Sequence, residues 1–329
     1  MNGSLREPSR GWWGGLALAL AATGAHGAEQ WPTKSIRFVC PYVAGGAADI
    51  FSRTIAVKLT EALGQNVIVD NRGGANGGIG TELVANSPAD GYTLLMGNAG
   101  PVTVNPVLYE KVPYDPVKSF APVTQGTLYM YVLVVPPSFP AATLKDFVAL
   151  LKAKPGQMTY GSTGIGGGNH LSGELFNLMT GTKSIHVPYK GSAAALTDVL
   201  GGQLSFMFDT VITSVPQLKA GKLRAFGVTG AKRSSSLPEV PTMDELGLKG
   251  FELTQWQGVM LPAGTPKEIV NRLHLEVVKA LKMPDVIDRL ATQGGNELVG
   301  NTPEQFAQVI KGDLTKYRKL VKEAGIKPQ

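Results

Sequence analysis

The chain has 329 residues, of which 43% are hydrophobic and 17% are charged. This length allows two domains of ordinary size, and the apolar content is normal for domains that bury a core. The formal net charge of +6 is spread along the chain without a basic run interleaved with aromatic residues, which argues against nucleic acid as a partner. A mild positive field suits an anionic ligand instead.

The first 27 residues have the pattern of a cleavable export signal. Arg6 and Arg10 precede a short apolar run at 16–22, and residues 25–27 (AHG) form a small-x-small cleavage pattern. The apolar run is shorter than the roughly 20 residues that span a bilayer, so an uncleaved anchor is the weaker alternative. We therefore expect the mature chain to begin near Ala28.

The rest of the sequence alternates between strand-like apolar runs and segments with helical periodicity. Phe51, Ile55, Leu59 and Leu63 recur every four residues and predict one helix face, which Gly64 ends. This alternation predicts an α/β fold with a mostly parallel sheet and helices on both faces. Expected strands are 36–42, 67–69, 92–96, 131–135, 158–160, 185–188, 204–208 and 223–228; expected helices include 79–85, one from a capping box at 143–146, 171–179, 193–200, 211–218, 269–281 and 303–324.

The middle segment carries its own set of alternating elements, which predicts two lobes. Residues 28–129 and 231–329 are expected to form the first lobe, and residues 130–230 the second. The two connections, near Tyr129–Met130 and Val228–Thr229, then act as a hinge beside a central cleft.

Three glycine-rich loops, 41–49, 71–78 and 160–170, each lie between an expected strand and an expected helix. The first amides of a helix lack partners within the helix, and the helix dipole places about half a positive charge there. Such a site attracts a carboxylate or phosphate without a cationic side chain. Facing loops from two lobes are therefore expected to grip the two ends of a dicarboxylate.

Several side chains in or near these loops leave two roles open. Asp49 is expected either to cap the first helix or to hold a ligand-bound water, and Asp209 either to meet an amino group of the ligand or to cap the helix from Val211. Lys190 is either an acid-neutralising group or an ordinary exposed lysine. The candidate ligand-binding residues are Tyr42, Val43, Ala44, Gly45, Gly46, Asp49, Gly74, Asn76, Asn98, Ser162, Thr163, Gly164, Gly166, His170, Tyr189, Lys190 and Asp209.

The sequence offers little material for catalysis. Ser162 has Tyr160 where a nucleophile elbow needs glycine, and there is no phosphate-binding P-loop or metal-spaced ligand cluster. His186 is expected to be structural, and His170 to cap its helix, orient the loop or touch the ligand. Cys40, the single cysteine, is expected to be a buried apolar residue. No catalytic residue, metal or cofactor is expected.

Five segments together resemble the Bug family, the extracytoplasmic receptors of tripartite tricarboxylate transporters. They are PYVAGGAADI at 41–50, VDNRGGANGGIGTELVA at 69–85, YGSTGIGGGNHLSGELF at 160–176, HVPYKGSAAALTDVLGGQLSFMFD at 186–209 and LPEVPTMDELGL at 237–248.

This resemblance implies a type II periplasmic binding protein fold, with ligand held between the loops 42–49 and 162–170 largely by backbone amides and waters. It implies a periplasmic receptor, expected to be monomeric, that passes a small organic acid to membrane transporter subunits. Two alternatives stay open: a receptor that signals to a membrane kinase, and, less favoured, a hydrolase.

Overall fold

The computed structural model describes residue 3 and residues 31–323, so the expected signal at 1–27 lies, apart from Gly3, outside the described residues. Between residues 31 and 323, ten strands join in one sheet with the central order β2-β1-β3-β9-β4-β7-β5-β6, and β8 and β10 both pair with β4. The strands are β1 (Ile36–Cys40), β2 (Val67–Asn71), β3 (Thr93–Asn98), β4 (Phe120–Val135), β5 (Thr159–Ser162), β6 (Ile185–Pro188), β7 (Phe206–Thr210), β8 (Arg224–Val228), β9 (Thr254–Pro262) and β10 (Glu297–Leu298).

The sheet is mixed rather than mostly parallel. β1 is parallel to β2 and β3, and β5 is parallel to β6 and β7, as the alternation predicts. However, β9 returns from the last third of the chain and inserts antiparallel between β3 and β4. The prediction also missed β9 and the first part of β4, and the first strand ends at Cys40 rather than Tyr42.

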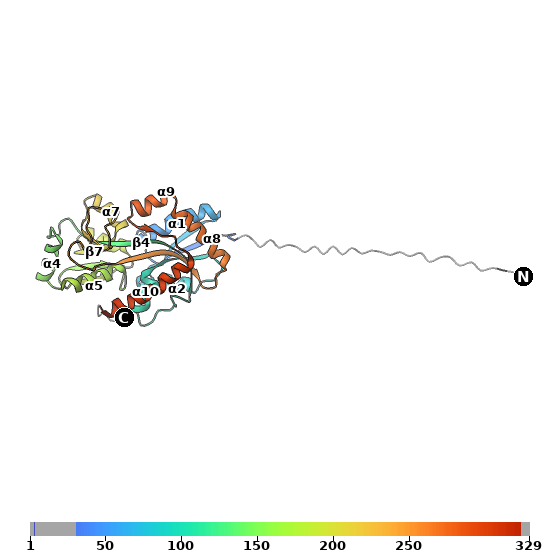
Figure 1. Cartoon of the computed structure of the whole chain (residues 1–329), viewed down its shortest axis with the longest axis horizontal. Helices are drawn as coiled ribbons and strands as arrows, with labels where there is room; N and C mark the ends of the chain where they lie inside the picture. The colour runs from blue at the N-terminus through green and yellow to red at the C-terminus, as the bar shows by residue number, and fades with distance from the viewer. Residues whose placement is uncertain (1–2, 4–30, 324–329) are drawn as a thin grey trace. The chain divides into compact units, whose positions relative to one another are not determined.

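Strand β4 belongs to both halves of the molecule. Its residues Phe120–Met130 pair with β9, whereas Tyr131–Val134 pair with β7 and the last residues also pair with β8. Figure 1 shows β4 running through the middle, with α4, α5 and α7 around one end and α1, α2 and α8 around the other. We call the part built on β1, β2 and β3 the first lobe and the part built on β5, β6 and β7 the second lobe.

The helices follow the predicted sequence signals closely. Phe51, Ile55 and Leu59 are fully buried on one face of α1, which ends at Gly64 in the left-handed conformation. Thr143 and Asp146 form the predicted capping box at the start of α4. The α-helices are α1 (Ala47–Leu63), α2 (Gly78–Ala85), α3 (Asn105–Leu108), α4 (Leu144–Ala153), α5 (Gly168–Thr180), α6 (Ser192–Leu200), α7 (Val211–Lys219), α8 (Lys267–Leu281), α9 (Pro284–Val286) and α10 (Pro303–Glu323); η1 (Ala75–Gly77) is 3₁₀, and η2 (Gly100–Val104) and η3 (Ile287–Thr292) are π-helical.

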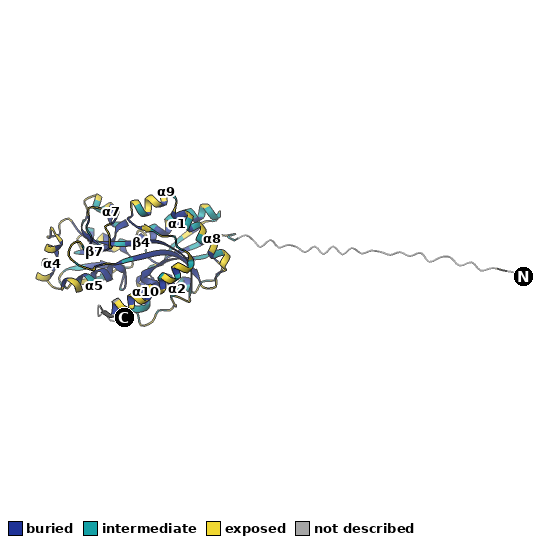
Figure 2. Ribbon diagram, viewed as in Figure 1, coloured by how far each residue is buried: buried dark blue, intermediate teal, exposed yellow. Residues whose placement is uncertain are grey.

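The strands are largely buried and the helices cover them, with exposed residues mainly on the outer helix faces and in the loops (Figure 2). In the second lobe, Phe147 packs against Phe176, Phe206 and Phe226 with ring centroids 5.1 to 5.7 Å apart. Such aromatic packing fixes α4 and α5 against the sheet. None of the helices between residues 31 and 323 is both apolar enough and long enough to span a bilayer.

Candidate functional site

A cavity lies between the two lobes, above the central strands β4 and β9. None of the side chains that line it is Lys, Arg, His, Asp or Glu. The lining therefore combines neutral hydrogen-bonding groups with small apolar ones. It consists of Tyr42, Val43, Gly46, Ala47, Ala48, Asn98, Tyr129, Tyr131, Thr163, Gly168, Asn169, Ser192, Thr210, Gln255 and Gln257.

The starts of four helices meet at this cavity. Ala47 and Ala48 begin α1, Gly168 begins α5, Ser192 begins α6, and Thr210 directly precedes α7. The first N–H groups of each helix have no acceptor within the helix, and each dipole contributes positive potential at its N-terminus. The helix starts thus contribute positive potential to the cavity although no cation lines it, which suits an anionic group.

The floor of the cavity is a hydrogen-bonded network of neutral side chains. Tyr42 donates to Oδ1 of Asn98 at 3.2 Å, and Nδ2 of Asn98 donates to the hydroxyl of Tyr129 at 2.9 Å. Tyr131 donates to Oε1 of Gln255 at 2.8 Å. Burial raises the pKa of all three tyrosines above the usual value, so their hydroxyls stay protonated. The floor therefore adds polar contacts without adding charge.

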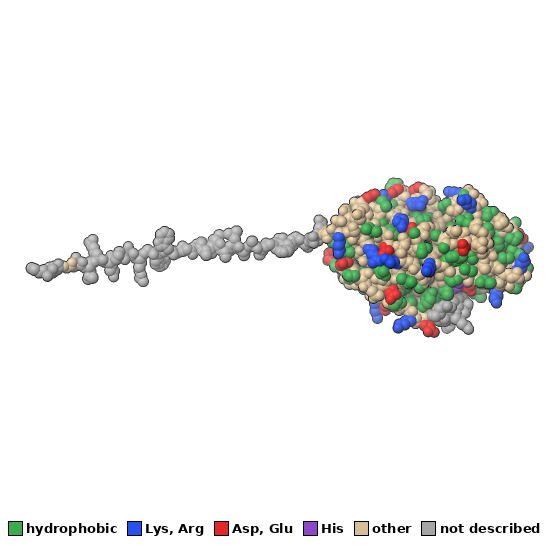
Figure 3. Space-filling model, turned by 180° about the vertical axis from the view of Figure 1, so that it is seen from behind, with side chains coloured by type: hydrophobic (Ala, Val, Ile, Leu, Met, Phe, Trp, Pro, Cys, Tyr) green, Lys and Arg blue, Asp and Glu red, His purple; other side chains and the backbone are tan. Residues whose placement is uncertain are grey.

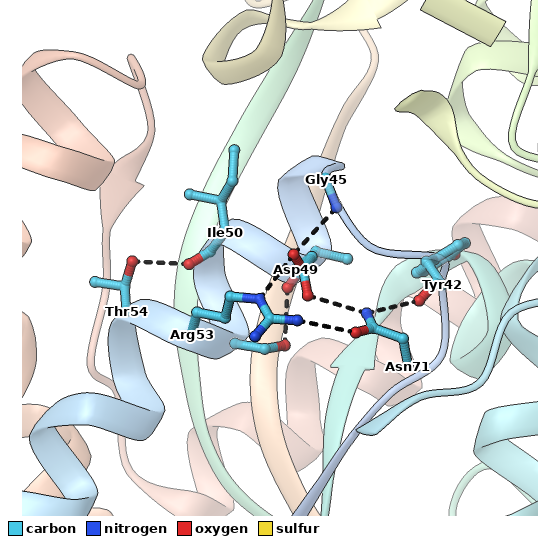
Figure 4. Close-up of polar contacts among 9 residues, drawn as sticks. Tyr42, Gly45, Asp49, Ile50, Arg53, Thr54 and Asn71 are labelled. Carbon is cyan, nitrogen blue, oxygen red and sulfur yellow. Dashed lines mark hydrogen bonds and ion pairs between the residues drawn. The ribbon is translucent and has the colours of Figure 1, made fainter. Parts of the chain in front are cut away.

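Asp49 braces the first glycine loop, 41–49 (Figure 4). Its side chain does not line the cavity. One carboxylate oxygen accepts from the amide of Gly45 at 3.1 Å and from Nε of Arg53 at 3.0 Å; the other accepts from Nδ2 of Asn71 at 3.0 Å. Burial raises the pKa of Asp49, but these donors outweigh it and lower the pKa below the usual value. Asp49 is not the N-cap, because α1 begins at Ala47 and the cap position is Gly46.

Two histidines support the glycine loop 160–170 on the side away from the cavity lining. The hydroxyl of Ser162 lies 2.5 Å from Nε2 of His186 and accepts from the amide of Gly164 at 3.0 Å. Nδ1 of His170 accepts from the amide of Gly166 at 3.2 Å. Burial lowers the pKa of His170 to about 4 and that of His186 to about 3, so both rings are neutral near pH 7. His170 therefore orients the loop, one of the roles expected for it.

Asp209 is fully buried on β7, beside the cavity-lining Thr210 but not in the lining itself. Its Oδ2 accepts from the hydroxyls of Thr213 at 2.6 Å and Ser214 at 2.9 Å, both in the first turns of α7. Burial raises the pKa of Asp209 to about 6, although the two hydroxyls oppose this shift. Asp209 is not the N-cap of α7, because the cap position is Thr210 and no side chain caps the first amides of the helix. Its carboxylate instead binds two side-chain hydroxyls of α7.

Most of the other candidate residues lie in the cavity or in one of two grooves. Tyr42, Val43, Gly46, Asn98 and Thr163 line the cavity. Val43 also lines an outer groove between the lobes, together with Asn76, Gly164, Tyr189 and Lys190. Gly45 lies in a further groove beside α6 and α7. Ala44, Gly74 and Gly166 do not line the cavity.

Two groups of lining residues were not among the named candidates. Ala47, Ala48, Gly168 and Asn169 lie inside the predicted binding loops without having been named individually, and Ser192 and Thr210 stand at the starts of α6 and α7, to which the helix N-terminus argument had not been applied. Tyr129, Tyr131, Gln255 and Gln257 come together only because β4 pairs with β9, across about 125 residues of sequence. No local pattern signals that pairing.

Comparison with known proteins places the chain in a family. Residues 51–326 match the protein family described as the tripartite tricarboxylate transporter family receptor. The protein BugT of Bordetella pertussis is 35% identical over 315 residues, which cover 95% of this chain and 96% of BugT.

Two solved structures share the whole fold. The periplasmic binding protein BugD superposes with a TM-score of 0.87 at 35% identity, covering 91% of this chain and 100% of BugD. Rpa4515 from R. palustris, solved with adipate, superposes with a TM-score of 0.88 at 36% identity and the same coverage. The predicted fold, a two-lobed periplasmic binding protein, is thereby confirmed. The chain belongs to the family of tripartite tricarboxylate transporter receptors.

Proposed function

We propose that this protein captures a small dicarboxylate in the cavity between its lobes and delivers it to the membrane subunits of a transporter. The observation that carries the proposal is the convergence of four helix N-termini on a cavity whose lining has no charged side chain. Neutral donors and dipoles bind a carboxylate without an ion pair, which favours release as well as capture. Adipate, present in the structure of Rpa4515, is a ligand of this class.

The proposal includes export, a hinge and the absence of turnover. The signal segment 1–27 directs the chain to the periplasm, where it acts as a monomer. The lobes comprise residues 28–129 with 231–329 and residues 130–230, which agrees with the change of partner of β4 between Met130 and Tyr131. Ser162 is fully buried, and its hydroxyl is engaged within the protein by Gly164 and His186, which supports binding rather than catalysis. The surface charge is mixed: on the face shown in Figure 3, basic and acidic side chains are interspersed.

Thermal unfolding with a panel of acids tests the ligand class. At a hundredfold excess over the dissociation constant, a ligand that binds only the native state adds about 2.7 kcal/mol to the unfolding free energy. Adipate or a shorter dicarboxylate should therefore raise the midpoint by several degrees, while the neutral diamide adipamide and glucose should not. A response to the diamide equal to that of the diacid would refute the proposed role of charge.

A matched pair of variants tests the site itself. Ala48 lines the cavity in the first turn of α1, where an acidic residue is compatible with the helix dipole. Ala48→Asp should abolish dicarboxylate binding by placing a negative charge in the ligand's position. Ala48→Asn fills the same space without charge and should retain more affinity. Equal losses in the two variants would show that space, not potential, limits binding.

A further inference from the structure

Asn76 connects the two lobes directly. It lies in η1 after β2, in the first lobe, and only 2% of it is exposed. Its Nδ2 donates to Oδ1 of Asn105 at 2.9 Å within that lobe, while its Oδ1 accepts from the hydroxyl of Thr163 in the second lobe at 3.3 Å. A neighbouring bond also crosses between the lobes: the hydroxyl of Tyr109 donates to the carbonyl of Ile165 at 3.2 Å.

Three glycines of the loop 160–170 lie against Asn76. A Cβ at Gly164 would lie 3.2 Å from the backbone nitrogen of Asn76, and one at Gly167 would lie 3.1 Å from its Oδ1. A Cβ at Gly166 would lie 3.4 Å from its Nδ2. We call Gly164, Gly166 and Gly167 the glycine socket. The close approach of Asn76 is therefore one reason for glycine at these positions, beside the positive φ of Gly164 and Gly166 and the contact of Gly167 with Thr163 of its own loop.

The backbone beneath Asn76 is strained. Ala75 and Asn76 both have φ near +47°, the left-handed region that non-glycine residues adopt at a cost. Asn105 supports this turn from below, because its Nδ2 donates to the carbonyl of Ala75 at 3.1 Å. Strained conformations of this kind persist where surrounding contacts hold them, and they concentrate at ligand clamps and switch regions.

We propose that Asn76, seated in the glycine socket, is the latch that holds the two lobes closed. Because the latch stabilises the closed arrangement of the lobes, it also sets how long a captured ligand stays bound. This statement about ligand residence rests on the proposed function. Because the contact joins protein to protein, the latch favours closure before any ligand enters. Asn76 is accordingly a positioning residue for binding rather than a ligand contact.

Two glycine substitutions separate the latch from the strain. Asn76→Gly removes the side chain and relieves the left-handed strain, whereas Ala75→Gly relieves the same strain one residue earlier and leaves the side chain in place. Spin labels at Lys152→Cys on α4 and Lys267→Cys on α8, both exposed, report the distance between the lobes. The native Cys40 is buried and does not compete for label.

In buffer alone, the labelled wild type and Ala75→Gly should show a short-distance closed population, and Asn76→Gly should lose most of it. Tyr109→Phe, which removes only the neighbouring interlobe bond, should shift the population less and in the same direction. With adipate as the probe, Asn76→Gly should dissociate roughly ten times faster than Ala75→Gly, the scale of losing a buried hydrogen bond.

Two results would overturn the latch: no closed population in the wild type, or equal distance distributions in Asn76→Gly and Ala75→Gly. The distances in buffer do not depend on the ligand. If adipate fails to bind the wild type while the buffer distances behave as expected, the ligand class is wrong and the latch stands.

Discussion

Gly168 packs directly against the ring and hydroxyl of Tyr131, so closely that a Cβ at position 168 would overlap the tyrosine side chain. Gly168 opens α5 and Tyr131 lies on β4, where only 2% of it is exposed and its hydroxyl is bonded to Gln255. This contact sets the distance between the start of α5 and the cavity floor.

Gly168→Ala should therefore destabilise the protein and weaken dicarboxylate binding. Overpacking in a filled core typically costs about 1 to 3 kcal/mol, and chemical denaturation measures it. The matched control is Gly312→Ala in α10, where a Cβ meets nothing within 4 Å. There the same substitution should stabilise by roughly 0.5 to 1 kcal/mol, because alanine favours a helix interior. If both variants change stability alike, the contact with Tyr131 is not limiting.

Asp49→Asn tests the brace of the first loop. The carboxylate accepts from the amide of Gly45, from Arg53 and from Asn71, and a carboxamide cannot accept all three bonds. We expect a loss of about 1 to 3 kcal/mol in unfolding free energy and weaker binding of adipate by calorimetry. Arg53→Gln is the control, since the more exposed partner should cost no more than about 1 kcal/mol. A larger effect from Arg53→Gln would contradict this order.

Acid should lower the free energy of unfolding through His170, which supports the loop 160–170. Its folded pKa of about 4 lies below the unfolded value of 6.5, so the neutral ring contributes stability that is complete above pH 6.5 and is lost as the pH falls toward 4. The facing groups are Glu174, 4.0 Å from Nε2, and the ring of His186 at 4.1 Å. At pH 5 the loss from His170 alone is roughly 2 kcal/mol.

His170→Gln removes this titration. The unfolding free energy of the wild type relative to His170→Gln should therefore fall by roughly 2 kcal/mol between pH 7 and pH 5. Between pH 7 and pH 8 the difference should stay constant, which is the internal control. A difference that does not change down to pH 5 would mean that the buried imidazole is not held neutral.

Cys40 should resist thiol reagents in the native protein. It is fully buried in β1, and burial raises the pKa of its thiol to about 11, so almost no thiolate exists at pH 7.5. A maleimide should label the denatured chain once and leave the native chain unlabelled over the same time. The variant Lys152→Cys, exposed on α4, should label rapidly under native conditions. Rapid native labelling of Cys40 would contradict its burial.

Local sequence signals predicted the parts of the fold that local physics decides. The four-residue spacing of Phe51, Ile55 and Leu59 predicted α1, and the capping box of Thr143 predicted the start of α4. The pairing of β4 with β9 was not predictable in this way, because contact between distant strands leaves no periodic trace. The floor of the cavity stands on that pairing, so Tyr129 and Gln255 were missed together.

The glycine loops show a different limit. Their positions and their helix N-termini were predictable, since glycine before a helix has a clear local meaning. The neighbour that each glycine accommodates was not predictable from the sequence. Gly164 and Gly167 accommodate Asn76 from the other lobe, and Gly168 accommodates Tyr131 from the floor. At these positions glycine allows the close approach of another side chain, and only the folded chain identifies which side chain that is.

The continuity of β4 has a mechanical consequence. β4 runs through both halves as one strand of 16 residues and changes partner from β9 to β7 between Met130 and Tyr131. We therefore expect any separation of the halves to bend β4 near this change of partner, with the hydrogen bonds on either side of the bend resisting a wide opening.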